Sequence, residues 1–214
     1  MATQFRPTFA ARRSLLRAFP NLRRNSGRKP KWRLRSPLSD SYQCVAWAAC
    51  RTDRKWWPVH HTQFYWPPNL PRITPPLLPW IPWPPTPVDY LVQGFATLGY
   101  SHCDRREFEF GYQKVAIYAN DGGATHMARQ RFLGNGWLTK PGDLEDIIHG
   151  DLKDVEGDMA VAAEKYGQVA EVLKRSWWSA ITNLCLFRCV WHTLKFSAWR
   201  LWWGALRVKW RAFP

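Results

Sequence analysis

The sequence lacks most features of secreted, metal-binding or membrane-spanning proteins. Its five cysteines in 214 residues do not have the paired spacing of a disulfide framework or a zinc finger. No uncharged apolar run reaches the ~18 residues that a membrane-spanning helix needs. Arginines interrupt the apolar residues near the N-terminus, which argues against a secretory signal. We therefore expect reduced thiols, no metal, no cofactor and a cytoplasmic protein.

Acidic residues are scarce at both ends of the chain. The net charge is +15, yet residues 41–173 hold 12 basic and 15 acidic residues. Residues 1–40 hold 11 basic residues and one acid, and residues 174–214 hold 8 basic residues and none. This asymmetry predicts three parts: a basic, largely disordered tail over 1–40, a folded domain over 41–175 with a proline-rich connector at 67–87, and a basic tail over 176–214.

Aromatic residues are concentrated in the C-terminal tail, which contains seven tryptophans between its basic residues. An amphipathic helix in a membrane interface uses basic groups for lipid phosphates and tryptophan for the headgroup boundary. The tail therefore predicts association with an anionic membrane surface. Nucleic-acid binding through basic groups and stacked rings is one alternative. A helix packed on the domain, or a tail without selected function, is another.

The central part reads as an α+β domain in which helices pack on a small antiparallel sheet. Helical patterns cover 42–51 and 88–100. Three compact strands at 114–119, 124–131 and 137–140, separated by glycine-containing turns, predict an antiparallel meander. Residues 143–149 are expected to form a short helical or turn segment. The periodicity of 159–175 fits either a strand or a helix.

One cysteine and one histidine carry the sharpest chemical hypothesis. Cys44 is expected in the first turn of a helix, where unpaired amides and the macrodipole favour a thiolate. His126 shares one face of its strand with Ala128 and Gln130. A buried cysteine and a structural histidine explain the same residues without any catalysis.

The domain resembles a bacterial family of unknown function over about 41–175. The resemblance rests on ordered motifs: C-x-A-W-A (44–48), W-W-P (56–58), Y-W-P (65–67), L-G-Y (98–100), K-V-A-I-Y (114–118), T-H-x-A-R-Q (125–130), G-W-x-T-K-x-G (136–142) and D-I-x-H (146–149). It supports the domain boundaries and implies no reaction.

A broader similarity is to papain-like cysteine hydrolases of the NlpC/P60 and CHAP types, which implies a papain-like fold. The resemblance implies that Cys44 is the nucleophile of amide or isopeptide hydrolysis and that His126 is its base. Asp146 or Thr139 would orient the imidazole, with His149 a poorer candidate. Gln43 or the amides around Cys44 would bind the oxyanion.

Two other functions stay open from the sequence. A non-catalytic binding or adaptor module would use a polar and aromatic ligand patch made of Arg129, Gln130, Trp137 and Lys140. A membrane-surface or nucleic-acid-associated protein would act through its basic tails. The partners predicted by these readings are a peptide or amide substrate, an anionic membrane surface or a nucleic acid.

Overall fold

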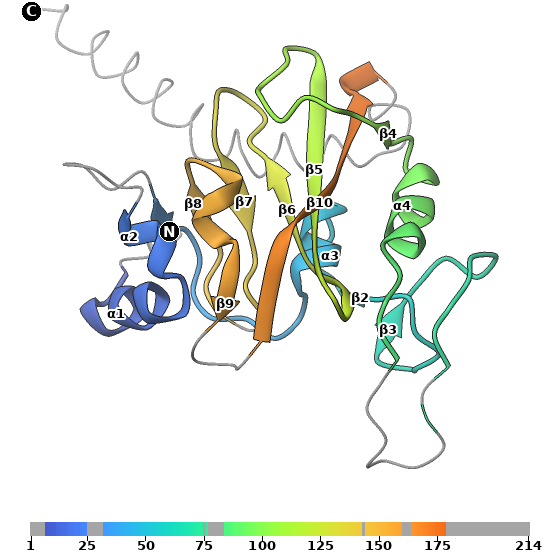
Figure 1. The fold of residues 1–214 in the computed structure, drawn as a ribbon, viewed down its shortest axis with the longest axis horizontal. Helices are drawn as coiled ribbons and strands as arrows, with labels where there is room; N and C mark the ends of the chain where they lie inside the picture. Colours follow the sequence, from blue (N-terminus) through green and yellow to red (C-terminus); the bar gives the residue numbers. More distant parts are fainter. Residues whose placement is uncertain are drawn as a thin grey trace, which may run out of the picture.

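A computed structural model describes residues 7–24, 32–74, 76, 84–142, 144–159 and 164–178. Its centre is an eight-stranded antiparallel sheet in the order β1-β8-β7-β6-β5-β10-β4, with β9 paired to β10 (Figure 1). The strands are β1 (Arg33–Leu34), β4 (Ser101–His102), β5 (Tyr112–Asn120), β6 (Gly123–Gln130), β7 (Trp137–Thr139), β8 (Ile147–His149), β9 (Gly157–Met159) and β10 (Glu164–Ser176). A separate parallel pair joins β2 (Lys55–Trp56) to β3 (Phe64–Tyr65).

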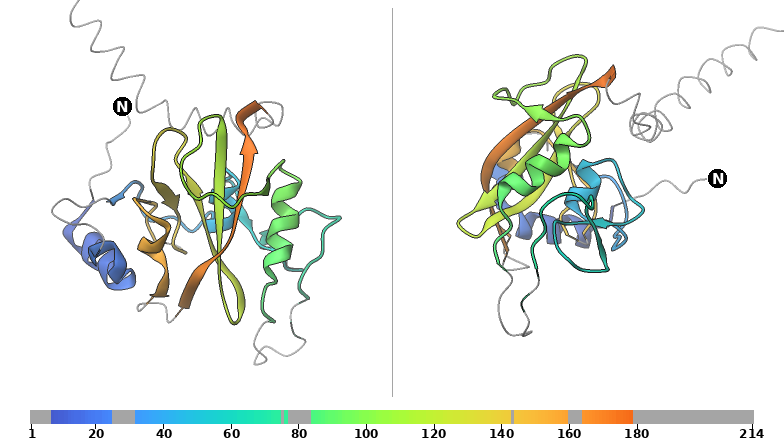
Figure 2. Two further views of the ribbon diagram at one scale, coloured as in Figure 1. Left: turned by 45° about the horizontal axis from the view of Figure 1, so that its top comes forward. Right: turned by 90° about the vertical axis from the view of Figure 1, so that its right-hand side faces the viewer.

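Helices cover both faces of the sheet. On one face lie α3 (Cys44–Ala48) and α4 (Val88–Ala96), and on the other lie α1 (Phe9–Ala18), α2 (Pro20–Arg24) and the 3-10 helix η1 (Leu152–Val155). Figure 2 shows α3 together with the β2–β3 segment against the sheet. We call these two surfaces the α3 face and the α1 face.

Alternation along the strands decides which side chains belong to each face. The α3 face is lined by Val115, Ile117, Met127, Leu138, Ile148 and Leu173. The α1 face is lined by Ala116, Tyr118, Ala128, Trp137, Ile147 and Val172. Because both faces are buried, β5 reads as a continuous apolar run, whereas a half-solvated strand would show simple alternation.

Much of the predicted domain is confirmed. The α+β class is confirmed, and the helices predicted at 42–51 and 88–100 and the meander at 114–140 correspond to the shorter α3, to α4 and to β5–β7. The expectation for 143–149 is wrong, because residues 147–149 form β8 between β7 and β1. In the undecided segment 159–175, residues 164–175 belong to strand β10, which pairs with β5, β9 and β4.

The N-terminal segment differs from the expected disorder. Residues 9–18 and 20–24 are helical, and Leu15, Ala18, Phe19 and Leu22 are buried against the α1 face. Thr8 caps α1 by accepting a hydrogen bond from the Ala11 amide. The apolar stripe outweighs charge repulsion because it covers the α1 face. The proposed boundaries at 40 and 175 themselves remain predictions. Residues 75 and 77–83 of the connector at 67–87 and all of the tail beyond 178 lie outside the described residues.

Candidate functional site

Cys44 opens α3 and is buried in the apolar core of the α3 face. The helix has five residues, and its sequence C-V-A-W-A is buried throughout. Tyr42 and Trp47 stack on each other beside it, with ring centroids 5.6 Å apart. Cys44 therefore has the predicted position at a helix start, within a packed apolar environment.

Gln43 precedes this helix but its amide is engaged elsewhere. Its Oε1 accepts a hydrogen bond from the Trp56 amide at 2.9 Å, and its Nε2 donates to the Trp56 carbonyl. Through these two hydrogen bonds, the Gln43 side chain pairs with the Trp56 backbone as a neighbouring strand would. The side chain thereby ties α3 to β2, and its role in binding an oxyanion stays a prediction.

His126 lies in the middle of β6 and points to the α1 face. Its ring stacks on Tyr166, with centroids 3.9 Å apart and planes 7° apart, and Tyr118 lies 5.6 Å away. Its Nε2 is hydrogen-bonded to the Thr139 hydroxyl. That hydroxyl has a single proton and donates it to the Met127 carbonyl at 3.1 Å, so His126 Nε2 is the donor in the pair.

Burial keeps His126 neutral. Desolvation lowers its pKa well below the usual value, and the nearby His149 lowers it further. Burial also lowers the pKa of His149, against the opposing effects of the Asp151 carbonyl and the Asp154 carboxylate. His149 Nε2 is buried without a hydrogen-bond partner among the described residues. Two uncharged imidazoles thus share the α1 face.

The structure does not bring Cys44 and His126 together. Cys44 belongs to the core of the α3 face, whereas His126 packs with Tyr118 and Tyr166 of the opposite core. The sheet itself separates the two side chains. The predicted nucleophile and base therefore lie on opposite faces: the strand alternation that faces Met127 and Arg129 toward α3 turns His126 away from it.

Asp146, the predicted orienting residue, is also far from that role. It accepts hydrogen bonds from the Tyr42 hydroxyl at 2.9 and 3.1 Å, and its amide donates to the Ser36 hydroxyl. Burial raises the pKa of Asp146, opposed by the Tyr42 hydrogen bond and by Lys140. Asp146 thus joins the segment that follows β1 to the start of β8, on the α3 face and away from His126.

The predicted ligand patch is divided between the two faces and buried. Arg129 stacks over Trp47 at 4.6 Å, and Lys140 lies 5.3 Å over the Tyr42 ring, both on the α3 face. Gln130 and Trp137 are buried on the other face, where Gln130 Nε2 donates to the Arg106 carbonyl. These four residues do not form a common surface.

A polar cluster that the sequence did not reveal lies around Cys50, just after α3. The sulfur is 2.8 Å from Arg129 Nη1 and 3.9 Å from Arg175 Nη2. Gln113 Oε1 accepts hydrogen bonds from Arg175 Nη2 at 2.9 Å and from the Tyr100 hydroxyl at 3.2 Å. Cys50 is disulfide-bonded, so the expectation of five reduced cysteines is wrong at this position.

An exposed aromatic cluster lies where the loops before β5 and after β6 meet the end of β10. It consists of the packed rings of Phe110, Phe132 and Trp177 and of their exposed neighbours in the chain, Leu133 and Trp178. The Trp177 ring is stacked on Phe132 at 4.4 Å and meets the Phe110 ring edge-on at 5.0 Å. Phe110, Leu133 and Trp178 are 76%, 55% and 79% exposed. A sequence scan for apolar residues in polar loops would have found Phe110 and Leu133.

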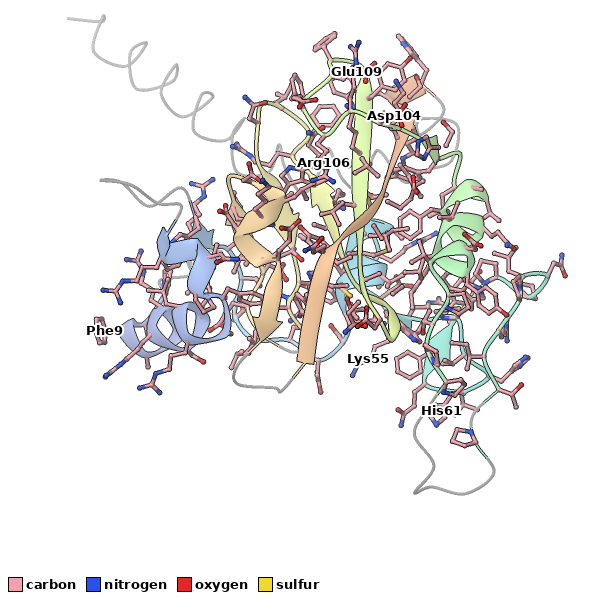
Figure 3. The ribbon with its side chains drawn as sticks, in the orientation of Figure 1. Phe9, Lys55, His61, Asp104, Arg106 and Glu109 are labelled. Atoms are coloured by element: carbon pink, nitrogen blue, oxygen red, sulfur yellow. The ribbon has the colours of Figure 1, made fainter. Side chains whose placement is uncertain are left out.

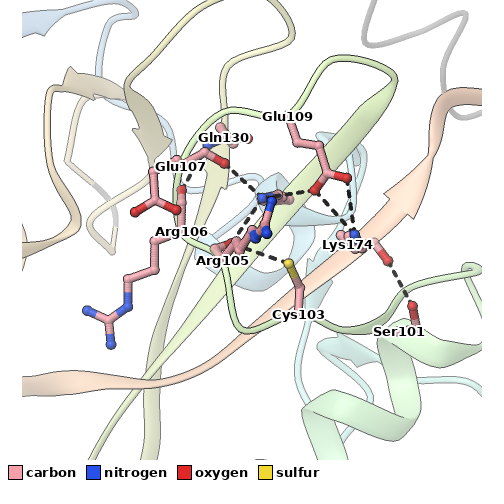
Figure 4. A network of polar contacts seen from close by, with 9 residues as sticks. Ser101, Cys103, Arg105, Arg106, Glu107, Glu109, Gln130 and Lys174 are labelled. Carbon is pink, nitrogen blue, oxygen red and sulfur yellow. Dashed lines mark hydrogen bonds and ion pairs between the residues drawn. The ribbon is translucent and has the colours of Figure 1, made fainter.

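Polar contacts fix the loop that presents Phe110 (Figure 4). Lys114, buried on β5, donates from Nζ to the carbonyls of Arg105 and Glu107 at 3.0 and 2.8 Å. Glu109 pairs with Lys114 at 3.3 Å and with Lys174 at 3.2 Å. Asp104, Arg106 and Glu109 lie at this end of the sheet, and Lys55 and His61 lie at the other (Figure 3).

Comparison with known proteins gives a family and no reaction. The family model described as a domain of unknown function (DUF7689) matches residues 33–174, well over half of the chain. The chain belongs to this family. The DUF7689 match runs from the start of β1 to Lys174 in β10, so α1 and α2 precede it, and of the aromatic cluster only Trp177 and Trp178 follow it. No curated protein and no solved structure gives a significant match, so none supports the papain-like resemblance.

The described residues contain neither a metal-binding cluster nor a membrane-spanning helix. Among the residues that the structure describes, no three His, Cys, Asp or Glu side chains are grouped as a metal ion would require. In that same part of the chain, no helix combines the length and apolarity needed to cross a bilayer.

Proposed function

We propose that this DUF7689 protein is a non-catalytic binding protein that associates peripherally with anionic membrane surfaces. The observation that carries the proposal is the aromatic cluster, which exposes three large apolar side chains at one end of a rigid sheet. The basic, tryptophan-rich segment 179–214 follows directly from Trp178.

The chemistry of the cluster suits a bilayer interface. Tryptophan and phenylalanine rings are stabilised at the headgroup boundary because the apolar ring leaves water. The indole N–H of tryptophan stays hydrated there. The paired contacts of Lys114 and Glu109 hold the loop in place, so little ordering entropy opposes insertion of Phe110.

The charge of the following segment supplies the second attraction. Residues 179–214 contain six Lys and Arg and no acid. Each basic residue near an anionic leaflet contributes about 1 kcal/mol, and stable anchoring needs two signals acting together. The aromatic cluster and the basic segment are two such signals, adjacent in the chain.

The test is co-sedimentation of the full chain with vesicles of phosphatidylcholine alone and of phosphatidylcholine with phosphatidylglycerol. We expect binding to the anionic vesicles that weakens as salt is raised. The double substitution Phe110→Ser with Trp178→Ser should reduce that binding about tenfold or more. Phe9→Ser is the matched control, because Phe9 is 80% exposed on α1, away from the cluster, and should bind as the parent protein does.

Three results would overturn the proposal. The first is equal binding to neutral and anionic vesicles, and the second is an equal loss for the Phe9 control. The third is binding to single-stranded DNA with no binding to either vesicle, which would assign the basic segment to nucleic acid.

A further inference from the structure

Helices α1 and α2 contact the sheet through apolar side chains at helical spacing. Leu15, Ala18, Phe19 and Leu22 fall at i, i+3, i+4 and i+7, and each is at most 3% exposed. This is the spacing of the anchor residues with which an amphipathic helix binds a hydrophobic groove. The two helices therefore contact the α1 face in the way that a bound helical peptide contacts its receptor.

The surface under these anchors offers both an aromatic ring and backbone acceptors. The centroid of the Phe19 ring lies 5.5 Å from that of Tyr166 on β10. Asn21 of α2 donates from Nδ2 to the carbonyls of Lys153 at 3.2 Å and Glu156 at 3.0 Å, in and directly after η1. The ring contact anchors the helices, and the amide fixes their position along the surface. Both helices lie together at one side of the sheet (Figure 1).

The charges of the two contacting segments are opposite. Residues 8–24 contain five arginines and no acid, whereas residues 151–156, which include η1, contain three acids and one lysine. Opposite charges that face each other across a contact favour the correct partner and speed its association, and salt screens this attraction. The α1 face thus suits a helix that is basic as well as amphipathic.

The family match separates this surface from the helices that cover it. The match begins at Arg33, after the end of α2, and runs through the strands and the 3-10 helix that form the α1 face. The extent of the family domain therefore includes the receiving surface and excludes residues 8–24.

We propose that the α1 face is a docking site for a basic amphipathic helix: residues 8–24 are its resident ligand, and the same segment of a second copy of the chain replaces them. The recognised helix carries large apolar anchors at i, i+4 and i+7 and exposes its arginines. Tethering gives the resident segment an effective concentration on the order of millimolar, so it competes strongly with a free copy. This docking does not depend on the proposed membrane binding.

The first experiment measures binding of a fluorescent peptide of residues 7–24 to the full chain. In one variant, Phe19→Ser together with Leu22→Ser weakens the resident segment. We expect the peptide to bind this variant at least about tenfold more tightly than the parent chain, in which the resident segment occupies the face. Raising the salt concentration should weaken the binding.

Two phenylalanines of the peptide provide a matched control. Phe19 is 3% exposed in the docked segment and Phe9 is 80% exposed. A peptide with Phe19→Ser should bind about tenfold more weakly or worse, and a peptide with Phe9→Ser should bind as the unchanged peptide does. Equal losses for the two peptides would contradict the proposal. A variant chain that keeps its folded sheet and does not bind the peptide would contradict it too.

A second measurement uses the parent chain and decides the matter even where the variant fails to fold. Hydrogen exchange of the isotope-labelled parent is followed by mass spectrometry as the unlabelled peptide is raised to about millimolar concentration. We expect the amides of α1 and α2 to exchange faster as the peptide displaces them, while those of β5 and β6 keep their protection. Unchanged protection of α1 and α2, or the same acceleration by the Phe19→Ser peptide, would overturn the proposal.

Discussion

The two faces of the sheet bury polar side chains in different ways. The α1 face holds neutral imidazoles, with His126 bonded to Thr139 and stacked on Tyr166. The α3 face holds guanidinium groups, with Arg129 and Arg175 converging on Cys50. The sequence motif T-H-x-A-R-Q contributes to both faces, because adjacent residues of a strand point in opposite directions. Residues close in sequence therefore belong to separate chemical environments.

The largest expected effect on the fold is that of a substitution at Gly167, a residue of β10. Its φ is +71°, and an added Cβ would lie 1.9 Å from the Ala119 carbonyl oxygen. The register of β9 against β10 shifts at this residue, next to Tyr166 on the α1 face. Gly167→Ala should lower the free energy of unfolding by about 3 kcal/mol or more, measured by urea denaturation, because strain and a backbone clash add.

Gly111→Ala is the matched control. Gly111 also has a positive φ, of +87°, but nothing lies within 4 Å of an added Cβ. Its cost should be about 1 kcal/mol, from the backbone conformation alone. Equal costs at the two glycines would show that the close approach of β10 to β5 at Ala119 is not present.

The next largest effect expected is a loss of stability in acid, caused by the buried histidines of the α1 face. The pKa values of His126 and His149 are lowered in the folded protein, so the unfolded chain binds more protons below its histidine pKa of about 6.5. The free energy of unfolding therefore has its full value above pH ~6.5. It falls as the pH drops below that value, by about 1.4 kcal/mol per pH unit for each proton taken up on unfolding. Urea denaturation at several pH values measures this slope.

His126→Phe should flatten the acid slope, because the ring stays and the titration is lost. His102→Gln is the control: His102 is exposed, and hydrogen bonds to Asp104 and Glu171 raise its pKa, so its contribution is present below ~6.5 and lost as the pH rises. A slope that depends on His102 and not on His126 would contradict burial of His126 on the α1 face.

The sequence could predict the elements of the fold but not the side on which each polar residue lies. The period-2 pattern and the glycine turns located β5, β6 and β7 and grouped His126 with Ala128 and Gln130. Which face of β6 packs against α3 is decided by tertiary packing. The local sequence of β6 does not indicate that face. Helix α1 was missed since its charge suggested disorder, although its apolar residues repeat at helical spacing.

The hydroxyl of Thr139 should have a smaller effect on the α1 face. Thr139→Val removes the acceptor of His126 Nε2 and leaves the Met127 carbonyl without that donor. We expect a loss of about 1–2 kcal/mol in thermal or urea denaturation. Thr139→Ser keeps the hydroxyl and should lose less free energy of unfolding. A larger loss for Thr139→Ser than for Thr139→Val would show that this hydrogen bond does not stabilise the fold.

The smallest effect expected is the coupling between Cys44 and His126. In a double-mutant cycle of Cys44→Ala and His126→Phe, the two losses of unfolding free energy should add within about 0.5 kcal/mol, because the residues belong to different cores. A coupling well above that value would indicate contact across the sheet.

The separation of Cys44 from His126 is tested most directly by an NMR titration of the His126 imidazole in the parent chain and in Cys44→Ser. The structure predicts a neutral ring from pH 9 down to below ~6.5, with the same titration curve in both proteins. A ring that is protonated near neutral pH in the parent and loses that charge in Cys44→Ser would reveal a thiolate–imidazolium pair. That result would contradict the two-face account and restore the hydrolase hypothesis.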